Sequence, residues 1–429
     1  MSLQDVTAGV PERLIAALDY SNLGTKFEAV SSRHDVHFFP ASGNTFSSTG
    51  IRVLRFNLVT TSYIVPESVR LQAVFKNTHA TSAITPLGPM SQLFSRVRVL
   101  GQGTLIEDQV NFDRLNSLHY KWMSPFQFRE ICNESFSLAH GASDFVQGDY
   151  EWNTIAAGKE MRIQMPFITL GIFNQPKLIP GRHINLVLEC ELTADANSWM
   201  DTLTQTGAAL PTWELFDINI LATCINLDAS LDSMIADRVL SGEVPMPIRT
   251  WVTQSQVITD KDFNLTMTRG VSRLASVVVT FATTDGAQDA AGKQCKEGTY
   301  LYFPPTAEEL AEWQLQLGIQ KYPDYPVRGI RETYYRARQA LCQPTTSLHS
   351  YACNLDKFAL DSYQCALDTE KMCGHTEYSG ANMRGGQQMF WQGKNFGTDA
   401  GDDAPKKAFV HINYQMMIML SDAGVQVLE

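Results

Sequence analysis

Apolar and polar side chains alternate with a period of two along much of this sequence. The longest such stretch covers residues 410–420, and shorter ones cover residues 54–58, 69–75, 184–192 and 263–267. Successive side chains of a strand point to opposite faces of its sheet, so this pattern predicts half-buried antiparallel strands. Helical periodicity is scarce, although a capping box predicts a short helix that starts at Thr306. The sequence therefore predicts an all-β protein.

The period changes in the middle of the chain, between Asp228 and Gly242. Apolar residues there share one helical face: Leu231, Met234, Ile235 and Val239. Asp228 is suited to cap the start of this helix, and Gly242 is suited to end it. Pro245 and Pro247 then break the chain, and we place a domain boundary here. The alternative is a helix that crosses within a single domain.

This boundary gives two halves, each a run of predicted strands. We predict an N-terminal arm at residues 1–38, a first sandwich at 39–227, a connecting helix and linker at 228–247, and a second sandwich at 248–429. An internal echo favours two equivalent domains. Phe-Asn-Leu occurs at residues 56–58 and 263–265, and each copy precedes a strand pattern with Arg-Leu and an alanine near its start.

Composition and charge exclude several classes of protein. Hydrophobic residues make up 44% of the chain and charged residues only 18%, which is typical of a globular protein and not of a disordered one. No apolar run approaches the roughly 20 residues of a membrane helix, and the N-terminus lacks the features of a signal peptide. The net charge of -11 disfavours direct binding of a genome through its phosphates. The eight cysteines show no zinc-binding spacing, and we expect reduced thiols of an intracellular product, with disulfides as the alternative.

No catalytic or cofactor motif stands out, so we predict that the protein is not an enzyme and binds no cofactor or metal. Gly101-Gln-Gly103 starts a dinucleotide-binding pattern without completing it, and it predicts a hairpin turn. His34 and His37 fall on opposite faces of one strand, which cannot present both to a metal ion. Met-Phe-Trp at residues 389–391 could form an exposed stacking platform, but a strand in the core is the more frequent role of such residues.

The most specific stretch runs from Trp313 to Leu341. Alternating apolar residues from Trp313 to Ile319 predict a strand, Pro323 and Pro326 predict an extended segment, and residues 330–341 have the pattern of a helix. This order of secondary-structure elements and short sequence motifs resembles the second half of double-jelly-roll major capsid proteins, most closely those of Polinton-like viruses and adintoviruses. The residues that carry the family signature are Tyr322, Pro323, Tyr325, Pro326, Val327, Arg328, Tyr334 and Tyr335. Three other segments resemble the same family, at residues 39–46, 93–115 and 408–429, and the resemblance is looser between about Pro125 and Gly181.

The resemblance implies a fold and a function. The fold would be two tandem jelly-roll β-sandwich domains with a few short helices. The function would be that of a major capsid protein of a DNA virus, whose homotrimers form pseudo-hexagonal capsomers of an icosahedral capsid. The implied partners are other copies of the chain, penton and minor capsid proteins, and an internal membrane or membrane-associated protein. The implied location is the virion, with assembly inside the host cell.

Without the resemblance, the sequence also fits a cellular all-β sandwich that binds carbohydrate or protein. Three positional expectations accompany the capsid interpretation. Tyr325 should be buried near the junction with the first sandwich. Residues 10–18 should present an apolar helical face to a protein or membrane partner. The loops at residues 195–213 and 285–298 should form outward towers or contacts between subunits.

Overall fold

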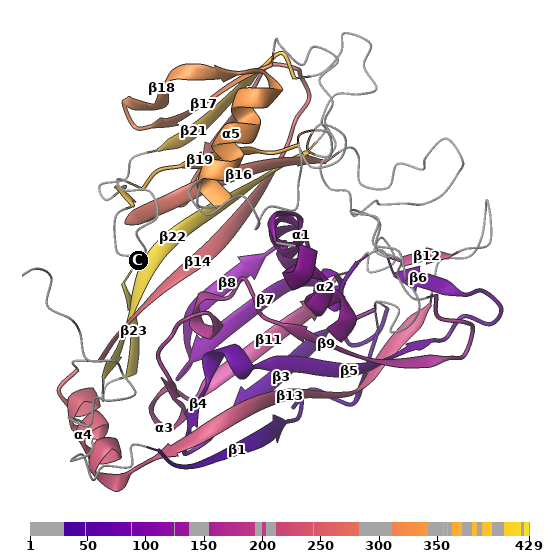
Figure 1. The fold of residues 1–429 in the computed structure, drawn as a ribbon, viewed down its shortest axis with the longest axis vertical. Helices are drawn as coiled ribbons and strands as arrows, with labels where there is room; N and C mark the ends of the chain where they lie inside the picture. The colour runs from indigo at the N-terminus through magenta and orange to yellow at the C-terminus, as the bar shows by residue number, and fades with distance from the viewer. Residues whose placement is uncertain are drawn as a thin grey trace, which may run out of the picture.

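The structure is a computed structural model that describes most of the chain. The described residues are 30–47, 49–86, 88–123, 125–136, 154–193, 200–202, 212–242, 244–282, 311–341, 355, 358, 363–370, 380–383, 388–396, 407–421 and 424–428. Their strands form two β-sandwiches, one above the other in Figure 1. The predicted helix at Thr306, the apolar face at residues 10–18 and most of the two predicted loops lie outside the described residues.

The first sandwich has two facing antiparallel sheets. Its long strands are β1 (Val30–Phe38), β3 (Val53–Leu58), β5 (Arg70–Asn77), β7 (Phe94–Gly101), β8 (Thr104–Val110), β9 (Glu160–Pro166), β11 (Leu186–Leu192) and β13 (Trp213–Leu227). One sheet has the order β1-β13-β5-β9, and the other has the order β3-β11-β7-β8. The short strands are β2 (Thr45–Phe46), β4 (Tyr63–Ile64), β6 (Ile84–Pro86), β10 (Ile179–Pro180) and β12 (Met200–Thr202).

The second sandwich repeats this arrangement. Its long strands are β14 (Val244–Val257), β15 (Phe263–Met267), β16 (Arg273–Ala282), β17 (Glu312–Leu317), β18 (Gln320–Arg328), β19 (Cys365–Asp368), β21 (Met389–Lys394) and β22 (Lys407–Ser421). One sheet has the order β14-β22-β16-β19, and the other has the order β15-β21-β17-β18. Two further strands, β20 (Ala381–Asn382) and β23 (Gly424–Leu428), pair with β16 and β22.

Helices are few and lie in the connections. The α-helices are α1 (Phe112–Trp122), α2 (Pro125–Glu134), α3 (Gly181–Ile184), α4 (Ala229–Leu240) and α5 (Gly329–Leu341), and the 3-10 helices are η4 (Pro66–Ser68), η5 (Met90–Leu93) and η6 (Gly171–Phe173). Helix α4 confirms the predicted helix between the halves. The Asp228 carboxylate accepts a hydrogen bond from the Ser230 amide, and Gly242 follows the helix with a φ of 72°. Its apolar face is less covered than the pattern suggested, because Met234 is 47% exposed.

Both sandwiches are jelly rolls with the same strand order. In each, the first long strand pairs with the last, the last pairs with the third, and the third pairs with the sixth. The second, seventh, fourth and fifth strands form the other sheet. This is a double Greek key, and it confirms the predicted pair of jelly rolls. The two Phe-Asn-Leu motifs lie in β3 and β15, the second long strand of each sandwich. The next long strands are β5 and β16, the third of each sandwich. The internal echo therefore marks equivalent strands.

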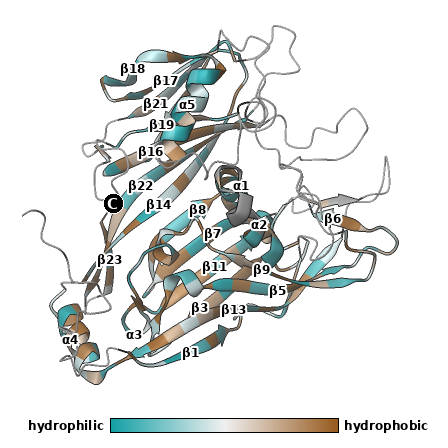
Figure 2. Ribbon diagram, in the orientation of Figure 1, coloured by the Kyte–Doolittle hydropathy of each residue, from teal (hydrophilic) through white to brown (hydrophobic). Residues whose placement is uncertain are grey.

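The period-two pattern places one face of each strand in a core. Residues of β3 and β5 alternate between buried and more exposed positions, and Figure 2 shows the same alternation of hydrophobic and hydrophilic residues along the strands. In the second sandwich, Trp391 is buried, and its ring stacks on Phe263 and Trp313 at centroid distances of 5.5 and 6.1 Å. The core interpretation of residues 389–391 is thus confirmed for Met389 and Trp391, which are both 1% exposed.

Some predicted boundaries of domains and strands do not coincide with the ends of the strands in the structure. Residues 30–38 were predicted to belong to an arm, but they form β1, which pairs with β13 from Val30 to Phe38. Residues 244–247 were predicted to be linker, but they begin β14. Pro245 and Pro247 are compatible with this because β14 is an edge strand of its sheet, where a missing backbone N–H costs little. Ile319 is not part of the predicted strand. It lies in the turn after β17 and is 97% exposed.

Candidate functional site

The two jelly rolls meet along a continuous junction. The first contributes β8, α1 and η6, and the second contributes β14, β22 and β23. In Figure 1, β8 is at the upper edge of the first jelly roll, and β14 is at the lower edge of the second. The fifth strand of one jelly roll therefore lies beside the first strand of the next, in a head-to-tail contact. Covering β14 also removes an exposed sheet edge.

Close backbone packing defines the centre of this junction. A Cβ atom on Gly171 of η6 would overlap the carbonyl oxygen of Arg249 in β14. Only glycine fits there, because the two backbones approach within the space that any side chain would need. Nearby, Lys177 Nζ donates a hydrogen bond of 3.2 Å to the Pro245 carbonyl.

A buried carboxyl group lies at the same place. Glu107 of β8 is 2% exposed, and its Oε1 accepts a 3.1 Å hydrogen bond from the Ile172 amide. Burial raises the pKa of Glu107 to about 8, while hydrogen bonds from the backbone of Ile172 and Gly171 and from the Thr250 side chain lower it. The Glu107 carboxyl is therefore mostly protonated at neutral pH. A Cβ atom on Gly171 would lie 2.9 Å from Glu107 Oε1 and would overlap the carbonyl oxygen of Arg249 in β14, so the buried carboxyl lies at the junction of the two jelly rolls.

Aromatic and basic side chains of α1 cover the outer face of the second jelly roll. The His119 ring meets Trp251 edge-on at a centroid distance of 5.0 Å, and Arg114 lies 5.4 Å from the centre of the Phe409 ring. Beneath them His411 hydrogen-bonds to Thr253 at 2.9 Å and to Thr280 at 3.1 Å. Burial lowers the pKa of His411 to about 3, so its ring is neutral at physiological pH.

The C-terminal strand extends the junction at its lower end. Val425 of β23 lies so close to Gly101, in the β7-β8 hairpin, that a Cβ atom on Gly101 would be 3.2 Å from Val425 Cγ2. Gln102 and Gly103 form the turn of that hairpin, with φ values of 49° and 85°. This confirms the predicted turn at Gly101-Gln-Gly103. It also gives the turn a second role, as a contact for the second jelly roll.

The signature segment lies at the other end of the second jelly roll. Its residues from Tyr322 to Arg328 belong to β18, which is far from the first jelly roll in Figure 1. The expected position near the junction is therefore wrong. Burial of Tyr325 was also expected, but its side chain is 55% exposed. Val327 is fully buried instead, and it pairs with Trp313. The pairing of β17 with β18 is irregular between Val327 and Tyr322, so Tyr325 and Val327 do not share a face as they would in a regular strand.

The other signature residues divide into anchors and surface groups. Tyr322 is half-buried and donates to Gln320 Oε1, and the Pro323 carbonyl accepts from Gln314 Nε2, each at 2.8 Å. Pro326 is half-buried, between exposed Tyr325 and buried Val327. Arg328 forms a 2.7 Å ion pair with Glu312.

Two tyrosines of α5 complete the signature. Tyr334 is half-buried, with its ring edge-on to Phe358 at 5.2 Å and Arg338 over its face at 5.9 Å. Tyr335 is 54% exposed.

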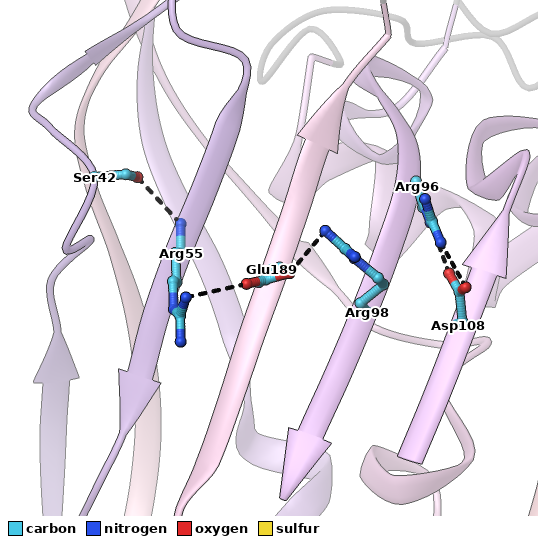
Figure 3. A network of polar contacts seen from close by, with 6 residues as sticks. All are labelled: Ser42, Arg55, Arg96, Arg98, Asp108 and Glu189. Carbon is cyan, nitrogen blue, oxygen red and sulfur yellow. Dashed lines mark hydrogen bonds and ion pairs between the residues drawn. The ribbon is translucent and has the colours of Figure 1, made fainter. Parts of the chain in front are cut away.

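A charged ladder covers the outer face of the β3-β11-β7-β8 sheet. Glu189 pairs with Arg55 at 3.5 Å and with Arg98 at 2.9 Å, and Arg96 makes a two-pronged contact with Asp108 (Figure 3). Exposed pairs of this kind contribute little stability. They do show that this face of the sheet is polar.

The described residues give no sign of a metal or membrane-spanning site. Among them no group of three or more His, Cys, Asp or Glu side chains could hold a metal ion, and no helix is long and apolar enough to cross a membrane. The described cysteines Cys132, Cys190, Cys224 and Cys365 are buried free thiols.

Reasoning from the sequence missed Glu107, Gly171 and His411. Each lies in a strand or turn whose local pattern is unremarkable. Their roles come from contacts with residues more than 60 positions away, such as Glu107 with Ile172. An Ile106-Glu107-Asp108 run that breaks the alternation of β8 was the one available signal.

Comparisons with known proteins support the fold. No protein-family model matches the chain, and neither does any curated protein sequence. Solved structures do match. The Faustovirus major capsid protein has a TM-score of 0.63 at 10% identity, over 98% of this chain and 94% of that one. A chain of the PBCV-1 virus capsid has a TM-score of 0.58 at 11% identity, over 98% and 99%. The mavirus major capsid protein has a TM-score of 0.52 at 11% identity, over 97% and 96%. Along its whole length, the chain therefore has the double-jelly-roll fold of these viral capsid proteins.

Proposed function

We propose that this protein is a major capsid protein, and that its activity is association rather than catalysis. The observation that carries the proposal is the repeat of one jelly roll in a head-to-tail pair, over the whole length of the chain. The full-length likeness to capsid proteins of Faustovirus, PBCV-1 and mavirus supports it.

The same geometry favours a homotrimer. A head-to-tail contact between identical copies is heterologous, and it forms a ring when the rotation closes. Two jelly rolls per chain would give six similar corners in a ring of three chains. Such a pseudo-hexagonal capsomer would tile an icosahedral shell, and the protein would reside in the virion after assembly in the host cell.

The finer assignments also belong to this proposal. The signature residues from Tyr322 to Tyr335 favour the Polinton-like virus and adintovirus lineage. Penton and minor capsid proteins would complete the shell, and an internal membrane or a membrane-associated protein would lie beneath it. The net charge of -11 favours a genome that is packaged without direct contact with this chain.

Native mass spectrometry and negative-stain electron microscopy of the purified full-length protein test the proposal. We expect trimers, hexagonal particles or shells. Each subunit should bury more than the roughly 2,000 Å² at which permanent interfaces begin. A stable monomer over a wide range of concentrations would contradict the proposal.

A further inference from the structure

We infer that the side chains of Ser42 and Gln256 close the free edges of strands β3 and β15, and so keep these edges from pairing with a strand of a second copy of this chain. Each side chain occupies backbone groups that an added strand would need. The inference goes beyond the proposed function, because it concerns a contact that copies of the chain must avoid.

β3 and β15 are terminal strands of their sheets. Within the described part of the chain, β3 pairs with β11 alone and β15 pairs with β21 alone. The second side of a terminal strand presents backbone N–H and C=O groups, which can template the pairing of another chain. The outer edges of β3 and β15 are therefore places where a second copy could add a strand.

The sequences of the two strands give these edges little protection. Residues 263–268 read Phe-Asn-Leu-Thr-Met-Thr and contain neither a charged residue nor a proline. Short segments of high β-propensity and low net charge, without proline, are typical of strands that stack between chains. β3 has one charged residue, Arg55, among its six. Protection has to come from groups outside the strands.

Gln256 of β14 occupies the free edge of β15. Its Oε1 accepts a 3.3 Å hydrogen bond from the Thr266 amide, and its Nε2 donates a hydrogen bond to the carbonyl oxygen of the same residue. A side-chain amide carries an acceptor and a donor side by side. It can therefore bind both backbone groups of one residue, as the opposite residue of an antiparallel strand does. Gln256 thus takes the place of the strand that it excludes.

Ser42, in the connection after β1, occupies the free edge of β3. Its Oγ accepts a 3.2 Å hydrogen bond from the Arg55 amide, shown in Figure 3, and donates one of 2.9 Å to the Val53 carbonyl. The Ala41 amide donates a 2.8 Å hydrogen bond to the Arg55 carbonyl. Both backbone groups of Arg55 are therefore occupied, and a second copy could pair there only after displacing residues 41 and 42.

The two jelly rolls close equivalent strands with different chemistry. In each, the blocking residue comes from the first long strand or the connection after it, and it acts on the second long strand. A hydroxyl serves β3 and an amide serves β15. The blocked positions also differ, because Arg55 precedes the Phe-Asn-Leu motif of β3 and Thr266 follows that of β15. The jelly rolls thus share a closed edge rather than a particular residue, which favours a role at the edge itself.

Both blocking side chains lie at the surface. Ser42 is exposed and Gln256 is half-buried. Substitutions at such positions usually change the stability of a single subunit little. Loss of either side chain should therefore open an edge in a protein that still folds.

Four variants of the full-length chain test the inference. Gln256→Leu and Ser42→Ala remove the groups that occupy the two edges. Gln254→Leu is the matched control, because Gln254 is also half-buried on β14, and its Nε2 donates a 3.2 Å hydrogen bond to the Thr268 side chain. Gln256→Lys removes the same hydrogen bonds as Gln256→Leu, but it places a charge at the edge, which opposes the addition of a strand.

Size-exclusion chromatography with light scattering measures the association of these variants. Gln256→Leu and Ser42→Ala should form species larger than those of the unmodified protein, at concentrations at least about tenfold lower, because pairing no longer requires the loss of two hydrogen bonds. The control and Gln256→Lys should associate as the unmodified protein does. Gln256→Leu without added association, or Gln256→Lys with as much association as Gln256→Leu, would overturn the inference.

The unfolding temperatures of the two Gln256 variants separate edge pairing from loss of fold. We expect them to be similar, because both variants lose the same two hydrogen bonds. Association that follows the unfolding temperature, rather than the charge at the edge, would also overturn the inference. The capsid proposal is tested on the unmodified protein alone, so it stands or falls independently.

Hydrogen exchange at Thr266 locates the contact. In dilute Gln256→Leu the Thr266 amide should exchange at least about tenfold faster than in the unmodified protein, because it has lost its acceptor. The exchange should slow again as the concentration rises and a second copy supplies a new acceptor. A purely structural role of Gln256 would give the first change without the second. Fast exchange at every concentration would therefore contradict the inference.

Discussion

Gly171 of the first jelly roll lies directly against the backbone carbonyl of Arg249 in the second, at a distance that leaves no room for a Cβ atom. This contact shows that the two jelly rolls form one packed unit and are not independent domains on a linker. It joins residues on opposite sides of helix α4, and it fixes the position of the edge strand β14 against the first jelly roll.

The Gly171→Ala variant should be less stable, because the methyl group would push β14 away from η6. Overpacking of this kind costs about 1–3 kcal/mol. Chemical denaturation monitored by tryptophan fluorescence would measure the loss. Gly270→Ala is the matched control, since no atom lies within 4 Å of a Cβ at Gly270. Equal stabilities of the two variants would contradict the close approach.

The Glu107→Gln variant should change how stability depends on pH. Burial raises the pKa of Glu107 from 4.5 to about 8, so the folded protein holds a proton that the unfolded chain releases. The stabilisation from this proton is complete below pH 4.5 and is lost as the pH rises through about 8. It amounts to at most about 1.4 kcal/mol per pH unit within that window.

Glutamine keeps the acceptor for Ile172 and does not titrate. The free energy of unfolding of the unmodified protein should therefore fall more steeply between pH 5 and pH 8 than that of Glu107→Gln, by roughly 1 kcal/mol per pH unit. Urea unfolding at several pH values measures both slopes, and the difference removes the contributions of other groups. Parallel slopes would show that Glu107 is ionised in the folded protein.

Two substitutions in β18 should have opposite consequences. Val327 is fully buried, so Val327→Ala should lower the free energy of unfolding by about 1–3 kcal/mol. Tyr325 is 55% exposed, and Tyr325→Ala should change the stability of the single subunit by less than about 0.5 kcal/mol. Urea unfolding of the two variants under conditions that dissociate any oligomer gives both values. A larger loss of unfolding free energy for Tyr325→Ala would contradict the exposure of Tyr325 and support the burial that was expected from the sequence.

The four described cysteines should resist thiol reagents in the native protein. Cys132, Cys190, Cys224 and Cys365 are buried, and burial raises the pKa of each thiol. Alkylation requires the thiolate, so burial removes both access and reactivity. Iodoacetamide labelling followed by peptide mass spectrometry should modify these positions at least about a hundredfold faster in urea than in native buffer. Comparable rates in the two conditions would contradict their burial.

The sequence by itself determined the local structure. The period-two alternation predicted the strands of both halves, and Asp228 and Gly242 marked the ends of α4. The repeated Phe-Asn-Leu motif identified equivalent strands, and the order of sequence motifs around Tyr322 pointed to a double jelly roll. These features depend on neighbours in the chain, because side-chain direction and backbone preference are local properties.

Only the tertiary structure decided how those elements combine. Residues 30–38 read as an arm, yet they form β1, because their partners in β13 lie almost 190 positions away, as in Val36 opposite Ala222. The alternation could not show that Tyr325 is exposed, or that Glu107 and Gly171 lie at a junction. Each of these properties depends on which distant surface covers the residue. That choice is made by packing within and between the two jelly rolls, and local preference has no means to encode it.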